Sequence, residues 1–154
     1  KERPDEEVIR NLITSEKLSK WNNVVPCPYC DLDFYCSEAC RTTDWSIHRV
    51  YCLPNRDRTP ELLKFHKQIR ETKTALPSAV RTISQMVAML DSGKSVAEAL
   101  EIIEHFHFFP LVFPEPGDFC ILLHELQMLT EFLYDDRIGS LFTMDNYHRI
   151  VGAW

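Results

Sequence analysis

The chain has 154 residues, of which 45% are hydrophobic and 26% charged, and a formal net charge of −6 at pH 7. This length suits one ordinary domain, or a small module joined to a larger helical region. No apolar run approaches the ~20 residues that a membrane-spanning helix needs, and the negative net charge argues against a general nucleic-acid binder. We therefore expect neither a membrane nor a nucleic acid as a direct partner.

The first expected element is a helix within residues 4–20. Apolar residues recur near helical spacing from Val8 to Leu18. Acidic residues stand before them, where the N-terminus of a helix favours negative charge. This helix leads into a segment of different composition.

Five cysteines and one histidine gather in residues 27–52. They form three closely spaced pairs: Cys27-x2-Cys30, Cys36-x3-Cys40 and His48-x3-Cys52. Thiolate and imidazole are the ligands of tetrahedral zinc, and short spacers let two donors bind the same ion. The chain shows no secretory signal or N-glycosylation acceptor that would favour disulfides. The pattern therefore predicts a zinc-binding module in a reducing compartment, the cytoplasm or the nucleus.

Six donors make one complete zinc site and half of another, because a structural zinc takes four ligands. Sequential pairing would use the first four donors and leave His48 and Cys52 unused. Cross-braced pairing would combine the first and third pairs, and leave Cys36 and Cys40 in need of two more ligands. Spacing alone does not decide between these alternatives.

Local signals predict the structure around the third and fourth cysteines of the module. Phe34-Tyr35 is expected in a short extended piece, and Ser37 is an expected N-cap for a helix through about His48. Such a helix would carry Cys40 and Trp45 on faces near that of His48.

Residues beyond the module predict helical hairpins packed together, without a strand pattern. A linker through Arg58 comes first, and Asp91-Ser92-Gly93 ends the second helix. An aromatic run at 106–113 ends the third at Pro110, and 138–142 is a short connection. The helix starts are Thr59-Pro60, Pro77-Ser78, the capping box Ser95–Glu98, Asp118 before an amphipathic helix through about Tyr134, and Thr143 before a helix through Ile150.

Reactive or ionisable residues outside the module suit structural roles better than catalytic ones. Cys120 stands in the apolar run FCILL, which predicts a buried thiol rather than a nucleophile. His105 and His107 fall on different helical faces, which favours ordinary helix-end histidines over a metal pair. Glu125 and Glu131 are expected on a solvated helix face.

The residues from Cys27 to Cys52 resemble the latter three quarters of a MYND zinc finger. The FYCSEAC segment, the Asp44-Trp45 pair and the His48-x3-Cys52 ending match that motif in order. A complete MYND finger carries one more CxxC pair upstream, which this chain lacks. The helical stretch that ends in EFLYDDRIGSLFTMDNYHRIVG is similar to the region after MYND in the SET-and-MYND lysine methyltransferases. Within that family, this chain is most similar to the fifth member, in which a long insert separates the first CxxC pair from the second.

The resemblance implies a cross-braced ligand set and a domain plan. Cys36 and Cys40 would belong to a second zinc site that is incomplete here. The donors of the complete site would be Cys27, Cys30, His48 and Cys52. The implied fold is mainly α: residues 1–26 as the helical end of an insert, a small cross-braced MYND finger at 27–52, and a helical region of a SET-type methyltransferase at 53–154.

The parent protein would then transfer a methyl group from S-adenosylmethionine to a lysine of a histone or another protein. Such enzymes use a glycine-rich segment and an Asn-His-x-Cys motif, and neither occurs in this chain. We therefore expect Zn²⁺ as the cofactor of this segment, with S-adenosylmethionine bound only by the parent protein. No catalytic residue is expected here, and the chain resembles the middle of such an enzyme.

The resemblance also implies peptide recognition, because MYND fingers bind proline-rich peptides in a groove beside the finger helix. Trp45 and Arg41 are the candidate peptide-binding residues, although Trp45 suits core packing equally well. The family often has glutamine where this chain has Arg41. An extended proline-rich peptide loses little entropy on docking. The alternative function is a non-enzymatic MYND adaptor for proline-rich partners; the helical region favours the methyltransferase.

Overall fold

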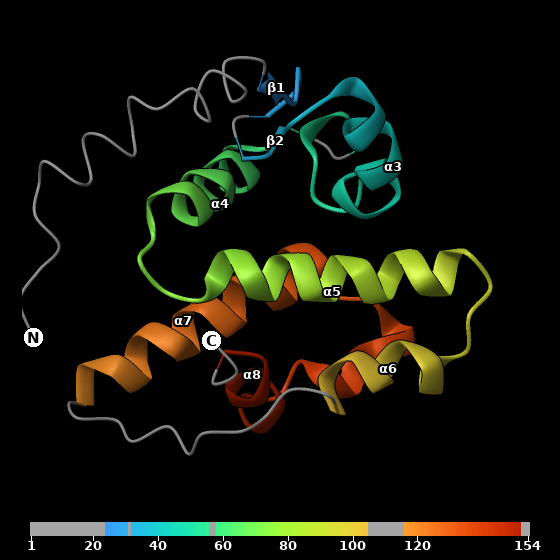
Figure 1. Ribbon diagram of the computed structural model, residues 1–154. Helices are drawn as coiled ribbons and strands as arrows, with labels where there is room; N and C mark the ends of the chain where they lie inside the picture. The colour runs from blue at the N-terminus through green and yellow to red at the C-terminus, as the bar shows by residue number, and fades with distance from the viewer. Residues whose placement is uncertain (1–23, 31, 56–57, 105–115, 152–154) are drawn as a thin grey trace, which may run out of the picture. The chain divides into compact units, whose positions relative to one another are not determined.

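The computed structural model of the chain describes residues 24–30, 32–55, 58–104 and 116–151, and these residues are mostly helical (Figure 1). The mainly α prediction is confirmed. The expected N-terminal helix, the aromatic run 106–113 and both His105 and His107 lie outside the described residues. No described helix is both long enough and apolar enough to cross a membrane.

The chain divides into two compact units between Thr43 and Asp44. In the first unit, strand β1 (Val25–Pro26) pairs antiparallel with β2 (Phe34–Tyr35), with Val25 opposite Tyr35. The backbone N–H of Cys27 donates to the carbonyl of Asp33 at 3.0 Å. The extended conformation expected for Phe34-Tyr35 is therefore confirmed, and the pairing closes the loop that carries the first CxxC pair.

Helix α3 (Glu38–His48) follows β2 directly. The hydroxyl of Ser37 accepts from the backbone N–H of Cys40 at 3.2 Å, which confirms the predicted N-cap. After His48 the chain turns tightly: the N–H groups of Tyr51 and Cys52 both donate to the carbonyl of His48, at 3.2 and 3.1 Å. A short 3-10 helix, η2 (Leu53–Asn55), follows.

Five helices make up the rest of the described chain, and α5 is central among them: it contacts α4, α6, α7 and α8. Figure 1 shows α5 running between α4 on one side and α6 and α8 on the other. The bounds are α4 Pro60–Glu71, α5 Leu76–Asp91, α6 Val96–Glu104, α7 Pro116–Leu133 and α8 Met144–Val151, with a 3-10 helix, η3 (Asp136–Leu141), before α8.

Side-chain caps fix the starts of three of these helices as predicted. Thr59 accepts from the N–H of Leu62 at 3.1 Å before α4, and Thr143 accepts from Asn146 at 3.3 Å before α8. At α6, Ser95 and Glu98 form the reciprocal capping box. The caps satisfy N–H groups that the helices leave unpaired.

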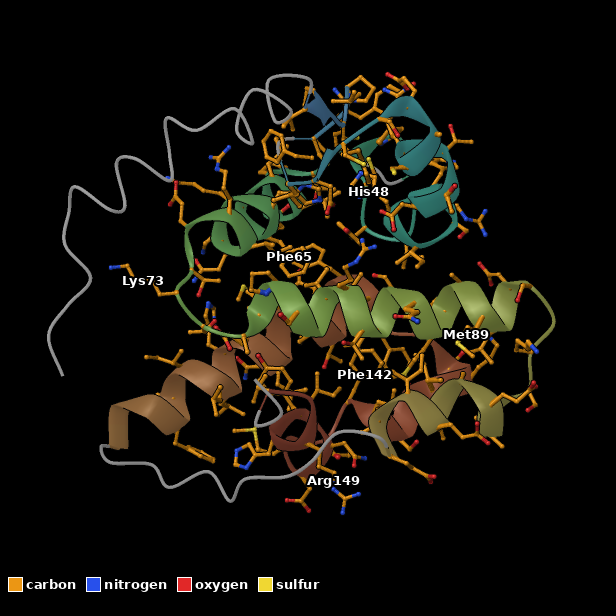
Figure 2. The ribbon with its side chains drawn as sticks, viewed as in Figure 1. His48, Phe65, Lys73, Met89, Phe142 and Arg149 are labelled. Carbon is orange, nitrogen blue, oxygen red and sulfur yellow. The ribbon has the colours of Figure 1, made fainter. Side chains whose placement is uncertain are left out.

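The core of the second unit lies around α5, whose buried face includes Val80, Ile83 and Met86. Phe65 of α4 is 1% exposed, and its ring stacks on Phe132 of α7 with centroids 4.7 Å apart. Figure 2 shows Phe65 on the side of α4 that faces α5. Apolar packing therefore holds α4 against the helices that form the core.

The structure departs from the sequence predictions at three element boundaries. Helix α5 begins at Leu76, one residue before the expected Pro77, and its N-cap residue makes no side-chain bond. Helix α7 begins at Pro116, so Asp118 lies within its first turns and is not its cap. The expected connection at 138–142 is largely the 3-10 helix η3.

The first half of α7 is not amphipathic as expected, because Phe119, Ile121 and Leu123 are all exposed. Ile121 lies about 200° around the helix from both Phe119 and Leu123, so one buried stripe cannot cover all three. The second half does follow the prediction, with Leu126, Leu129 and other residues in the core.

Candidate metal centre

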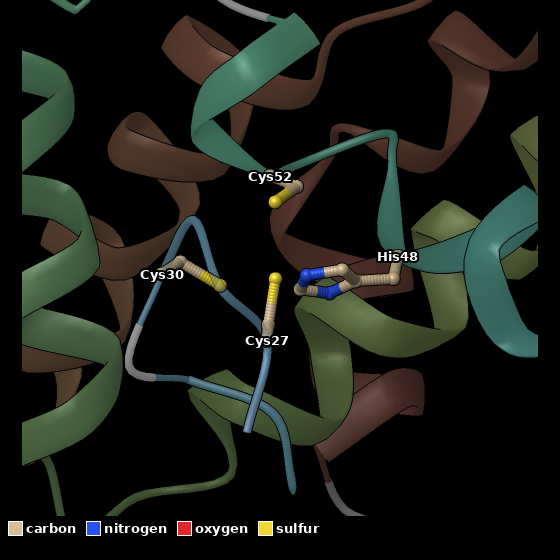
Figure 3. A group of neighbouring side chains, drawn as sticks. All are labelled: Cys27, Cys30, His48 and Cys52. Atoms are coloured by element: carbon tan, nitrogen blue, oxygen red, sulfur yellow. The ribbon is translucent and has the colours of Figure 1, made fainter. Parts of the chain in front are cut away.

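Among the described residues, three thiols and one imidazole form a buried group (Figure 3). The ligand atoms all lie within 4.8 Å of one another. Figure 3 shows the three sulfur atoms and the imidazole turned toward a common centre. The group consists of Cys27, Cys30, His48 and Cys52.

Different local structures present the two pairs of side chains. Cys27 and Cys30 lie in the short loop that begins at the end of β1, and the β1–β2 pairing fixes that loop. His48 is the last residue of α3, and Cys52 follows one tight turn later. His48 and Cys52 are both 0% exposed. Water is therefore excluded from this pair of donors.

The turn between His48 and Cys52 packs against α4. The ring of Tyr51 meets the ring of His48 edge-on, with centroids 4.9 Å apart. The carbonyl of Tyr51 lies 2.7 Å from Nε2 of His66, a residue of α4 that is 7% exposed. Spacing did not point to His66, although its place among Leu62, Phe65 and Ile69 on the buried face of α4 is visible in the sequence.

Two ion pairs also join the second half of α3 and the residue after it to α5. Arg81 of α5 makes a bidentate contact with the carboxylate of Asp44, and Arg49 pairs with Asp91 at 3.0 Å. Hydrogen bonding to Asp44 is the largest cause that raises the pKa of Arg81 above its ordinary value. A bidentate contact fixes orientation better than a single charge pair does.

Cys36 and Cys40 do not join the buried group. Both thiols are exposed, and their sulfur atoms lie 3.0 Å apart across the start of α3. Hydrogen bonding from the Ser37 hydroxyl, followed by that from Cys36, lowers the pKa of the Cys40 thiol. A lower thiol pKa favours the thiolate, which is the form that binds metal.

The candidate peptide-binding residues Arg41 and Trp45 are one turn apart on α3. The Arg41 side chain is 32% exposed and forms an ion pair with Glu38 at 2.6 Å. Trp45 is half-buried, and its ring centroid lies 5.9 Å from that of His48. Trp45 therefore packs beside His48 and still presents part of its surface.

Two predictions outside the zinc module are wrong. Cys120 is exposed, because it lies in the first half of α7, ahead of the turns that contribute to the core. Glu125 is 1% exposed rather than solvated. Its carboxylate accepts from the hydroxyl of Tyr147 at 2.6 Å and from that of Thr74. Glu131 is exposed, as expected. Six helical residues turn through about 600°, so these two glutamates face different directions.

Comparison with protein families matches residues 17–52 to the MYND finger. This segment includes all four members of the buried group and the exposed Cys36 and Cys40. No curated protein and no solved structure matches the chain. The chain thus contains a MYND zinc finger, a module that mediates interactions between proteins.

The donor chemistry of the buried group fits Zn²⁺. Three thiols and one imidazole make a ligand set typical of structural zinc, which is four-coordinate and tetrahedral. Four protein donors leave no open position for water or substrate, so the group suits a structural rather than a catalytic ion.

Proposed function

We propose that this segment is a zinc-dependent interaction module in which Cys27, Cys30, His48 and Cys52 hold one Zn²⁺. The observation that carries the proposal is the buried group of these donors within a segment that matches the MYND finger. Zinc binding in so small a module provides folding free energy, since the bare donors have little reason to remain buried together.

The ligand assignment predicts different effects for cysteines of the two groups. Cys27→Ser and Cys52→Ser should each abolish tight metal binding, because three donors cannot complete a tetrahedral site. Cys36→Ser is the matched control and should leave binding nearly intact. The thiolate charge-transfer absorbance of the cobalt-substituted chain measures this. Loss of metal in Cys36→Ser, with retention in Cys52→Ser, would instead establish sequential pairing.

The proposed interaction surface is the exposed side of α3 that carries Arg41 and Trp45. An aromatic ring that is half-buried is held rigidly and still offers apolar area to a partner. Proline-rich peptides are the proposed ligands, and weak binding, at roughly micromolar to millimolar strength, suits a contact with so few anchors.

Trp45→Ala tests this surface, with Ser46→Ala as the control on an exposed neighbouring position of α3. We expect Trp45→Ala to remove peptide binding and to retain zinc, with Ser46→Ala unchanged in both respects. Chemical-shift changes on adding proline-rich peptide provide the measurement. No change near residues 41–45 in the wild-type chain would refute the proposed surface.

The parent protein is proposed to be a SET-and-MYND lysine methyltransferase, with this segment as scaffold and recognition element. Support comes from the resemblance of residues 131–152 to the region that follows MYND in that family, and from the helical region that accompanies the finger. The flanking sequence should then contain an upstream CxxC pair and a downstream Asn-His-x-Cys motif. Flanks without both would favour the adaptor function. The segment alone should not bind S-adenosylmethionine in calorimetry.

A further inference from the structure

Tyr51 lies in the turn that joins two members of the candidate metal centre, His48 and Cys52. Its N–H donates to the carbonyl of His48, and its ring packs edge-on against the His48 imidazole. It is 4% exposed. Any movement of Tyr51 therefore displaces the donors on both sides of it.

His66 holds Tyr51 from outside the finger. Its Nε2 atom lies 2.7 Å from the Tyr51 carbonyl oxygen. A carbonyl oxygen can only accept, so Nε2 carries the proton and donates it. A hydrogen bond between groups that are this well buried is costly to lose.

The part of α4 that carries His66 is packed into the core. Leu62, Phe65 and Ile69 lie near it on the same helix, and all three are buried. Phe65 also stacks on Phe132 of α7. The hydrogen bond to Tyr51 is therefore made from a helix whose own place is fixed by the core.

We propose that His66 is a positioning residue for the metal centre, an inference that rests on the proposed function. By donating to the Tyr51 carbonyl, it holds the His48–Cys52 turn so that the imidazole and the thiolate face the Cys27 and Cys30 sulfurs. Hydrogen bonds made directly to a metal ligand from outside the coordination shell typically change metal affinity about 10- to 100-fold. His66 acts through Tyr51, between two ligands, so we expect an effect at the lower end of that range.

This role extends the metal centre beyond the finger as the family comparison defines it. The match ends at residue 52, whereas His66 belongs to α4. The helical region then contributes to zinc affinity, and zinc binding in turn stabilises the contact between the turn and α4 by the same free energy.

Three variants of the full chain test the proposal. Glutamine places its amide nitrogen where Nε2 of histidine lies, whereas the shorter asparagine cannot reach the Tyr51 carbonyl. His66→Asn is therefore the loss variant and His66→Gln the rescue. Ile69→Ala is a matched control, because it weakens the packing of the same helix and leaves the hydrogen bond from His66 to Tyr51 in place. Zinc affinity is measured by chelator competition under reducing conditions, below the melting temperature of every variant.

We expect His66→Asn to weaken zinc binding by about 10-fold, and its cobalt form to show a shifted d–d spectrum. His66→Gln should stay within about threefold of wild type, and Ile69→Ala should melt earlier with unchanged affinity. Wild-type affinity in His66→Asn, no rescue by glutamine, or an equal loss in Ile69→Ala would each overturn the role of His66. A wild-type chain that takes up no zinc would overturn the proposed function instead.

Discussion

At the residue scale, the buried carboxylate of Glu125 is the group outside the metal centre that most needs hydrogen-bond partners. Burial of an ionised carboxylate is costly unless hydrogen bonds replace its lost hydration. Tyr147 and Thr74 provide these bonds, and Tyr147 is itself 1% exposed. The hydroxyl of Thr74 also accepts from the N–H of Leu76 at 3.3 Å. The three side chains therefore join α7 and α8 to the start of α5.

Tyr147→Phe should lower the free energy of unfolding by about 1–3 kcal/mol, since one carboxylate oxygen loses its donor. Urea unfolding of the zinc-loaded chain measures this. Tyr134→Phe is the control, because Tyr134 is 52% exposed, and should change stability by less than about 0.5 kcal/mol. Equal stability of the Tyr147→Phe variant and the wild type would show that the buried contact contributes nothing.

The same tyrosine predicts a pH effect. Burial, followed by the hydrogen bond to Glu125, raises the pKa of Tyr147 above its ordinary value. A raised pKa in the folded state stabilises the fold fully below about pH 10, and this contribution is lost as the pH rises above that value. The stability advantage of wild type over Tyr147→Phe should therefore shrink in strong alkali. An advantage that grows there would contradict the assignment.

At the element scale, α6 depends on its capping box. Glu98 accepts from the N–H of Ser95 at 2.8 Å and from Lys94 at 3.0 Å. These bonds lower the pKa of Glu98 to about 2, and the bond from the Ser95 backbone is the largest cause. The carboxylate therefore remains charged well below the pH at which an ordinary glutamate is protonated.

The box should stabilise α6 above about pH 4.5 and lose that effect as the pH falls toward 2, because the depressed pKa belongs to the folded state. Wild type should exceed Glu98→Gln in stability at pH 7 and match it near pH 2. Carbon-13 shifts of the Glu98 carboxyl follow the titration directly. A midpoint near the ordinary value of about 4.3 would contradict the box.

The end of α5 provides a second test at this scale. Gly93 has a φ of 91° and donates to the carbonyl of Leu90 at 3.0 Å. Gly93→Ala should lower the free energy of unfolding by about 1 kcal/mol, because L-residues rarely adopt this conformation. Gly117→Ala is the matched control. Both sites have open space around the added carbon, but Gly117 lies in α7 without a positive φ and should gain stability from helix propensity. Equal effects in thermal unfolding would argue against strain at Gly93.

Elements were predicted well where the sequence carries a local signal. The caps at Ser37, Thr59, Ser95 and Thr143 and the stop at Gly93 act within four residues, so they can be recognised without knowing the fold. The start of α5 carries no side-chain cap, and its boundary was misplaced by one residue. Pro116 begins α7 before Asp118, because proline suits a first helical turn.

At the scale of the whole molecule, prediction failed where partners come from distant parts of the chain. The buried carboxylate of Glu125 accepts hydrogen bonds from Tyr147 and Thr74, which are distant in the sequence. No local pattern predicts these contacts. His66 reaches Tyr51 from another helix for the same reason. Spacing identified the donors of the metal module, whereas their assignment to one centre came from the resemblance. In the structure Cys27, Cys30, His48 and Cys52 form one buried group.

The central claim is that this chain holds one structural zinc, and the metal content of the purified chain tests it most directly. Elemental analysis under reducing conditions, after exchange into metal-free buffer, should find about one zinc per chain, since one four-donor set is complete. Removal of that zinc by a strong chelator should unfold the finger, which circular dichroism and thermal melting would detect. No zinc would contradict the claim outright. Two tightly bound ions would show that Cys36 and Cys40 belong to a second complete site.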